Sequence, residues 1–213
     1  ISELRTVSER GTLNDAAIIA QSGTIAWVGP ASEAPAADEK VDLGGRAVLP
    51  GWVDSHTHMV FDGDRSAEFE ARISGGSYEA GGIAVTMDAT RQAGTDRLDK
   101  LVADRVAAGR RGGTTTFETK TGYGLNTESE VEAAKVASRH VDDVTFLGAH
   151  LVPPGADAEE YLDEVVGPML EGVAPYVQWI DVFCERGAFN EEQSRRVLEA
   201  GKKLGLGPVS YTH

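Results

Sequence analysis

The feature of this chain that most restricts its fold is the regular alternation of predicted strands and helices from residue 51 onward. Short apolar runs recur there at intervals of about 30 residues, which is the length of a β/α unit. Strands that alternate with helices in this way pair as a parallel sheet, because each helix carries the chain back to the same end. The predicted strands span residues 52–58, 114–119, 144–150, 177–183 and 208–213.

The segments between these strands carry helical patterns. Apolar residues within 98–106 recur at the spacing of one helix face and predict an amphipathic helix. Thr127 and Glu130 match a capping box, which predicts that the next helix begins there. Asn190 is expected to cap the last helix at its N-terminus. Residues 62–85 are expected to form an extra loop, of a kind that often holds substrate.

The number of predicted strands determines the expected architecture. A closed (β/α)8 barrel needs eight strands, whereas about five are found here. We therefore expect an α/β fold in which residues 49–213 form an incomplete (β/α)8 TIM-type barrel with its C-terminal part missing. Residues 1–48 are expected to form a small β-sandwich segment, because they combine a hairpin of 16–20 and 24–28 with a strand at 46–49.

The composition argues against several classes of function. The 213 residues carry a formal net charge of -14 at pH 7, which repels nucleic-acid phosphates and anionic lipid surfaces. The chain has one cysteine, Cys184, so no disulfide can form within it, which is typical of a reducing cytoplasm. No apolar run reaches the roughly 20 residues that span a bilayer. We therefore expect a cytoplasmic protein that binds neither nucleic acid nor membrane.

Two histidines one residue apart, His56 and His58, form the strongest chemical signal. They follow a Pro-Gly turn at residues 50–51 and end the first strand of the predicted barrel. Residues i and i+2 of a strand point to the same face, so both imidazoles can face one ion at the usual zinc–nitrogen distance of about 2 Å. The pair therefore predicts a metal site. Glu118 and Lys120, at the end of the second strand, are expected to have structural or supporting roles.

Segment 50–58, which carries the histidine pair, resembles the metal-binding first strand of the amidohydrolase superfamily. Further segments narrow the resemblance to the imidazolonepropionase family, and the similarity covers most of residues 10–205. The similar segments are 61–69, 81–83, 113–118, 120–125, 145–150, 181–185 and 187–189.

This resemblance implies a fold, a reaction and a metal. The family fold is a (β/α)8 barrel with a β-sandwich built from both chain ends. The reaction is metal-dependent hydrolysis of the cyclic amide of 4-imidazolone-5-propanoate to N-formimidoyl-L-glutamate, in histidine degradation. One zinc or iron ion per subunit is held by three histidines and one aspartate. His56 and His58 match the first two histidines and His213 falls where the third is expected, whereas the aspartate and the acid/base residues are expected beyond His213.

The resemblance also implies four substrate-binding residues. Arg65 would clamp the propionate of the substrate through two hydrogen bonds. Tyr123 and Tyr78 would hydrogen-bond the carboxylate or the ring, and His150 would contact the ring carbonyl or a ring nitrogen. The expected partner is thus a small anionic substrate, and a homodimer is one assembly left open.

Two other functions stay open. The chain could be another amidohydrolase, such as a deaminase or a dihydroorotase-like enzyme, although the segments around Arg65 and Tyr123 argue against this. Measuring ring opening against ammonia release separates these enzymes. The chain could also be a catalytically inactive fragment that binds a small anion without turnover. Metal content and turnover, compared with a longer version of the protein, separate that case.

Overall fold

The computed structural model describes residues 1–64, 66, 70, 73 and 81–209. The chain divides into two compact units, Ile1–Trp52 and Val53–His213. Among the described residues, no helix combines the length and the apolar character needed to cross a membrane.

The first unit contains two small antiparallel sheets within its described residues. β1 (Glu3–Arg5) pairs with β2 (Thr12–Asn14), and β3 (Ala16–Gln21) pairs with β4 (Thr24–Pro30). The two residues between β3 and β4 have φ values of 51° and 76°, and a two-residue hairpin turn requires such positive angles. The hairpin predicted from the sequence is therefore confirmed. A short 3-10 helix, η1 (Ala31–Glu33), follows β4.

The separate strand predicted at residues 46–49 is wrong. Val48 forms only an isolated parallel bridge with Leu4 of β1. Pro50 follows two residues later and has no N–H to donate, so the pairing cannot continue as a ladder. β1 and β2 were not predicted, because three residues are too few to establish an alternating pattern.

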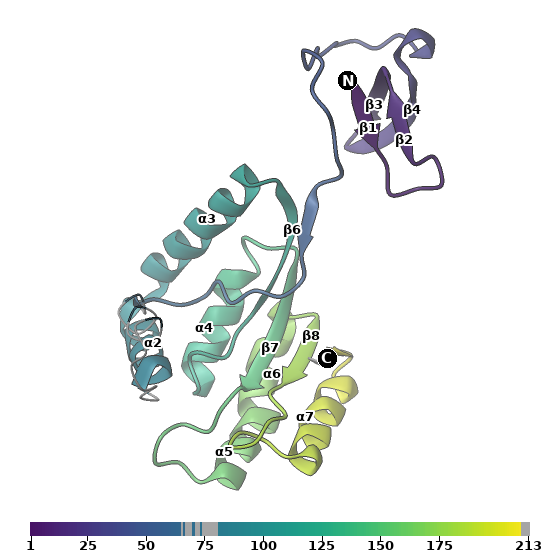
Figure 1. The fold of residues 1–213 in the computed structure, drawn as a ribbon. Helices are drawn as coiled ribbons and strands as arrows, with labels where there is room; N and C mark the ends of the chain where they lie inside the picture. The colour runs from purple at the N-terminus through teal and green to yellow at the C-terminus, as the bar shows by residue number, and fades with distance from the viewer. Residues whose placement is uncertain (65, 67–69, 71–72, 74–80, 210–213) are drawn as a thin grey trace. The chain divides into compact units, whose positions relative to one another are not determined.

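A five-stranded sheet runs through the described part of the second unit, and the spatial order of its strands follows the sequence (Figure 1). The strands are β5 (Trp52–Asp54), β6 (Thr114–Lys120), β7 (Asp143–Ala149), β8 (Trp179–Val182) and β9 (Gly207–Pro208). The pairings from β6 through β9 are parallel. This confirms the prediction of an α/β fold with a parallel sheet.

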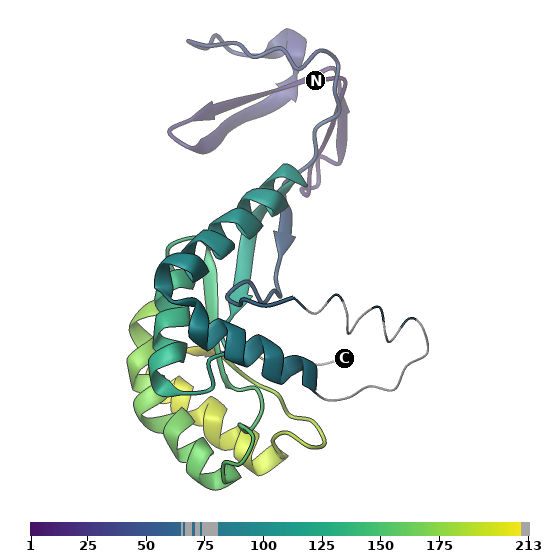
Figure 2. The ribbon, with the colours of Figure 1, turned by 90° about the vertical axis from the view of Figure 1, so that its left-hand side faces the viewer.

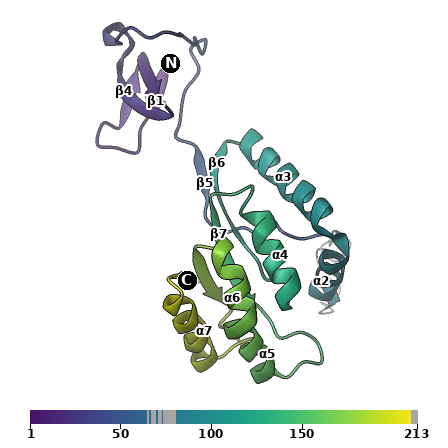
Figure 3. The same cartoon turned by 180° about the vertical axis from the view of Figure 1, so that it is seen from behind.

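Helices cover one face of this sheet (Figures 2 and 3). The α-helices are α2 (Gly81–Ala93), α3 (Thr95–Arg111), α4 (Thr127–Ala137), α5 (Ala158–Glu164), α6 (Leu170–Val173) and α7 (Glu191–Lys203). A π-helical turn, η2 (Val165–Met169), joins α5 to α6, and the 3-10 turn η3 (Ala174–Tyr176) follows α6. Contacts join α3 to β6, α4 and α6 to β7, and α7 to β8. α2 occupies the end of the segment predicted as a loop over 62–85.

Side chains alternate between the two faces of the sheet, as the pleat of a strand requires. Phe117, Phe146 and Ile180 are buried in the core beneath the helices. Residues that alternate with them line a cavity of about 300 Å³ on the other face, among them Thr116, Glu118, Lys120, Asp143, Thr145 and Asp181. The sheet therefore has an apolar face that stabilises the fold and a polar face that is free for chemistry.

The capping box predicted at Thr127 and Glu130 is wrong. Asn126 caps α4 instead, since its side chain accepts a backbone N–H of the first turn at 2.9 Å. The Glu130 carboxylate turns back to the preceding loop, where it accepts backbone N–H groups. The last helix begins as predicted, because Asn190 caps α7 in a capping box with Gln193.

Candidate functional site

His56 and His58 lie just beyond the end of β5, which is shorter than the predicted strand. The intervening Thr57 lies beside β6, where the backbone N–H of Lys120 donates to the Thr57 carbonyl at 2.9 Å. The Thr57 N–H instead donates to the side chain of Glu118, at 3.2 Å. A side chain thus replaces a backbone acceptor, which interrupts the regular ladder and explains the short strand. The two imidazole rings have centroids 5.5 Å apart and planes tilted by 59°.

The histidine pair fits a metal ion on the chemistry of its donors. Imidazoles that bind one ion at about 2 Å have ring centroids roughly 5–6 Å apart, and the separation found here is 5.5 Å. The Nδ1 atom of His58 is buried without a hydrogen-bond partner among the described residues. Burial, followed by the charges of neighbouring groups, of which His150 is the largest, lowers the pKa of His58 to about 3. The ring is therefore neutral at pH 7, as ligation requires.

The described residues do not by themselves form a complete set of metal ligands. Within those ranges of the chain, no group of three or more His, Cys, Asp or Glu side chains could hold an ion. The predicted third histidine, His213, lies outside the described residues, as do Arg65 and Tyr78.

A second cavity, of about 190 Å³, opens beside the histidine pair. It is lined by His56, His58, Leu147, His150, Asp181, Val182 and Phe183. His150 follows the end of β7, and its ring stacks on that of His58 with centroids 5.5 Å apart. Its Nδ1 lies 3.0 Å from the carbonyl oxygen of Gly122. A carbonyl only accepts hydrogen bonds, so Nδ1 carries the proton and Nε2 of the neutral ring is an acceptor.

Burial also lowers the pKa of His150, although the Gly122 carbonyl and the Asp181 carboxylate oppose this shift. Two adjacent imidazoles, of His58 and His150, are thus both biased toward the neutral form. These two neutral rings can accept hydrogen bonds from a polar heterocycle, or donate hydrogen bonds to it, without placing a fixed positive charge against it.

Tyr123 lies on the loop after β6 and completes a ring cluster. Its ring centroid is 5.5 Å from that of His58 and 5.7 Å from that of His150. Phe61 lies at 6.0 Å from the same tyrosine. The neighbouring Gly122 has a φ of 111°, and a Cβ there would meet the Leu147 carbonyl oxygen at 2.6 Å, so only glycine permits this loop path.

Glu130 anchors the loop that carries Tyr123 through hydrogen bonds to its backbone, a role that the sequence analysis did not predict. Its carboxylate is fully buried and accepts the backbone N–H groups of Gly122, Gly124 and Leu125 at 2.9, 2.7 and 3.0 Å. Burial raises the pKa of Glu130, and these hydrogen bonds oppose the shift. The signal available in the sequence was a carboxylate one helical turn after a Gly-rich loop, which a capping box explains equally well.

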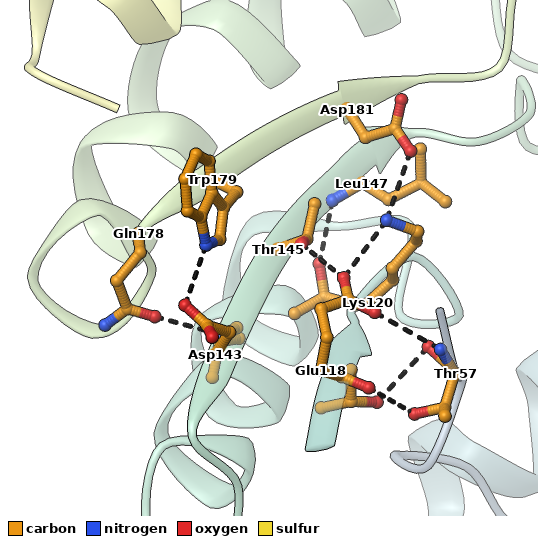
Figure 4. Close-up of polar contacts among 12 residues, drawn as sticks. Thr57, Glu118, Lys120, Asp143, Thr145, Leu147, Gln178, Trp179 and Asp181 are labelled. Atoms are coloured by element: carbon orange, nitrogen blue, oxygen red, sulfur yellow. Dashed lines mark hydrogen bonds and ion pairs between the residues drawn. The ribbon is translucent and has the colours of Figure 1, made fainter. Parts of the chain in front are cut away.

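A cluster of charged side chains occupies the polar face of the sheet, next to the histidine pair (Figure 4). Lys120 Nζ lies 3.0 Å from a carboxylate oxygen of Glu118 and 3.3 Å from one of Asp181. The Thr145 hydroxyl also donates to Glu118. All three charged side chains are nearly buried: Lys120 is 5% exposed, Glu118 is 12% exposed and Asp181 is 5% exposed. Asp181 was not singled out from the sequence, although it alternates with the buried Ile180 in β8.

Comparisons with known proteins show what this chain is similar to. No family model matches the sequence. The chain is 62% identical over 213 residues to a protein of Micrococcus luteus named imidazolonepropionase, covering 97% of this chain and 53% of the relative. It is 61% identical to the imidazolonepropionase of Arthrobacter sp. (strain FB24), and the match covers 97% of this chain and 52% of that relative. It is 52% identical to the imidazolonepropionase of Streptomyces coelicolor, and this match covers 94% of this chain and 52% of that relative. The chain thus spans about half the length of these curated relatives.

A solved structure shares the fold. The crystal structure of 5-methylcytosine deaminase from Klebsiella pneumoniae, liganded with phosphonocytosine, matches with a TM-score of 0.62 and 15% sequence identity. The match covers 99% of this chain and 50% of that chain. Similarity at this level of identity bears on the fold alone. The sequence identity to the curated relatives, by contrast, extends along nearly the whole chain, which is similar to about half the length of proteins named imidazolonepropionase.

Proposed function

We propose that this protein hydrolyses the cyclic amide of 4-imidazolone-5-propanoate to N-formimidoyl-L-glutamate, a step of histidine degradation. The observation that carries the proposal is the ring cluster of His58, Tyr123 and His150, whose centroids lie 5.5–5.7 Å apart. These residues come from three separate segments of a chain whose relatives bear the name of this activity. A metal ligand and two substrate contacts would then meet in one cluster of rings.

We propose that His56 and His58 hold the metal together with His213 and an aspartate beyond it. Imidazole ligands suit zinc and iron alike, so the proposal is one ion of either metal per subunit. The unpartnered Nδ1 of His58 supports this assignment, because a buried polar atom without a partner is costly unless a ligand satisfies it. When bound, such an ion supplies a water molecule that is acidic enough to yield hydroxide near neutral pH.

The remaining residues would bind and orient the substrate. Tyr123, on a loop anchored by Glu130, would donate a hydrogen bond to the propionate or the ring. His150, with Nδ1 turned to the Gly122 carbonyl, would offer Nε2 to the imidazolone ring. Arg65 would hold the carboxylate, and Tyr78 would contact the carboxylate or the ring, as the family resemblance implies. Binding energy from the propionate end then aligns the ring for attack, which lowers the entropic part of the barrier.

We further propose the finer architecture expected from the sequence. Residues 49–213 would form a partial (β/α)8 barrel whose interior is the polar face of the sheet, and residues 1–48 a β-sandwich segment. The parallel sheet with strands in sequence order, and the likeness to half of the deaminase chain, support this proposal. A cytoplasmic location and a homodimeric assembly remain predictions from the sequence.

The test is turnover by the full-length protein, loaded with zinc or iron and supplied with 4-imidazolone-5-propanoate. We expect loss of the imidazolone chromophore and stoichiometric formation of N-formimidoyl-L-glutamate. A chelator should abolish turnover, and re-addition of the metal should restore it. Release of ammonia in place of the ring-opened product would instead identify a deaminase. Absence of both products from the metal-loaded protein would refute the hydrolase assignment.

A further inference from the structure

The segment that carries both imidazoles is held by side chains as well as by strand pairing. Thr57 lies between His56 and His58, and it makes two hydrogen bonds to one residue of β6. Its backbone N–H donates to Glu118 Oε2 at 3.2 Å, and its hydroxyl donates to the Glu118 carbonyl oxygen at 2.6 Å. The position and tilt of the Thr57 peptide therefore depend on Glu118, and the two flanking imidazoles share that peptide.

The other carboxylate oxygen of Glu118 is held in turn. Glu118 Oε1 lies 3.0 Å from Lys120 Nζ and also accepts the hydroxyl of Thr145 in β7. Lys120 Nζ also lies 3.3 Å from a carboxylate oxygen of Asp181 in β8. The chain of contacts thus runs from the histidine segment across three neighbouring strands (Figure 4). Both oxygens of Glu118 are engaged, so its carboxylate has little freedom to rotate.

This arrangement is a costly way to stabilise a sheet. Each charge of the cluster is at least 88% buried, and the desolvation of buried ions generally offsets their mutual attraction. Apolar residues at the same positions would stabilise a fold at least as well. The cluster contacts the histidine segment directly, and its residues line the two cavities beside that segment. Positioning of the histidine segment therefore explains the cluster better than stabilisation of the sheet does.

We propose that Glu118 and Lys120 are positioning residues for the metal site. Lys120 fixes the Glu118 carboxylate, and Glu118 fixes the Thr57 peptide, which sets the separation and orientation of the imidazoles of His56 and His58. The inference rests on the proposed metal binding by these histidines. Residues that orient metal ligands generally contribute about 10- to 100-fold to metal affinity, and that is the effect expected here.

The experiment titrates metal-free, full-length protein with Co²⁺ and follows the visible absorption of the bound ion. The variant is Glu118→Gln, which keeps the size of the side chain but removes its charge. The matched control is Asp143→Asn, the same chemical change on the neighbouring strand. Asp143 lines the same cavity, and its carboxylate accepts the indole N–H of Trp179 at 2.8 Å, a contact that does not involve the histidine segment.

We expect the control to bind Co²⁺ with the affinity and spectrum of the unaltered protein. Glu118→Gln should bind about 10- to 100-fold more weakly and with a changed spectrum, because the ligand geometry is altered. Thermal unfolding of the metal-free proteins separates this effect from a general loss of stability. Equal affinity and an unchanged spectrum in Glu118→Gln would overturn the inference.

A second variant covers the case in which Glu118→Gln does not fold. Thr57→Val removes the hydroxyl contact to Glu118 while leaving every charge of the cluster in place. It should weaken Co²⁺ binding several-fold and shift the spectrum, and an unchanged affinity would contradict the inference. Failure of the unaltered protein to bind Co²⁺ would overturn the proposed metal-dependent function, and the positioning role with it. Normal binding by both variants would overturn the positioning role alone.

Discussion

At the scale of single residues, His58 combines burial with an unsatisfied polar atom. A buried nitrogen without a hydrogen-bond partner costs about 1–3 kcal/mol of folding free energy. In the described structure Nδ1 of His58 is such an atom, and the rings of His56 and His150 lie with their centroids 5.5 Å from the His58 ring. This cost is expected where function, rather than stability, has selected the residue.

The lowered pKa of His58 predicts a pH dependence of stability. The pKa of His58 is about 3 in the folded protein, against the ordinary histidine value of 6.5 in the unfolded chain. Between these values the unfolded state binds more protons, so stability falls as the pH drops. Lowering the pH from 7 to 5 should therefore cost the metal-free protein about 2 kcal/mol through this residue. Urea unfolding at both pH values should show that His58→Gln loses less stability by that amount, and an equal loss would contradict the shift.

Substitution of Tyr123 tests the substrate-binding role at the same scale. Tyr123→Phe removes one hydroxyl from the ring cluster, and a lost hydrogen bond to a charged carboxylate is worth about 1.5–3 kcal/mol. The KM should rise about tenfold or more while kcat changes little, because the contact is present in both ground and transition states. Tyr176→Phe is the control, since Tyr176 packs near Lys135 at 5.7 Å and not in the cluster. A fall in kcat at constant KM would assign Tyr123 to the chemical step instead.

At the scale of elements, the loop between β6 and α4 is ordered by the helix that follows it. Glu130 accepts the backbone N–H groups of this loop, and Arg91 of α2 donates to the carbonyl oxygens of Gly124 and Leu125 at 2.6 and 3.2 Å. Backbone N–H groups and carbonyl oxygens of this loop thus have hydrogen-bond partners, although the loop is neither a strand nor a helix. The loop can therefore present Tyr123 from a fixed backbone.

Removal of this anchor should destabilise the protein strongly. In Glu130→Ala three buried N–H groups lose their acceptor, and each unsatisfied group costs about 1–3 kcal/mol. The free energy of unfolding should fall by at least about 3 kcal/mol in chemical denaturation. Glu128→Ala changes an exposed residue of the same helix and should stay within about 0.5 kcal/mol of the unaltered protein. Equal effects of the two substitutions would show that Glu130 does not anchor the loop.

At the scale of the whole molecule, local patterns predicted the β/α alternation of the second unit and one hairpin of the first, and they failed to predict the contacts between elements. The β/α alternation and the β3–β4 hairpin are visible in the sequence because periodicity and turn residues are local properties. The contact of Thr57 with Glu118 joins residues 61 positions apart, and no local pattern encodes it. It is also the reason that β5 stops short of the histidine pair.

The same limit applies to the candidate site. His56, His58, Tyr123 and His150 could be predicted because motifs and family resemblance point to them, and the structure brings their rings together. Glu130 could not, because its sequence context fits a helix cap equally well. Its role depends on full burial and on the path of a loop that only the folded chain defines.

The most direct test of the metal site is anomalous diffraction from crystals of the full-length, zinc-loaded protein, measured at the zinc absorption edge. We predict one strong peak per subunit at a distance of about 2 Å from a ring nitrogen of both His56 and His58. A zinc peak that contacts neither ring, or imidazoles that turn to opposite sides of the segment, would contradict the account.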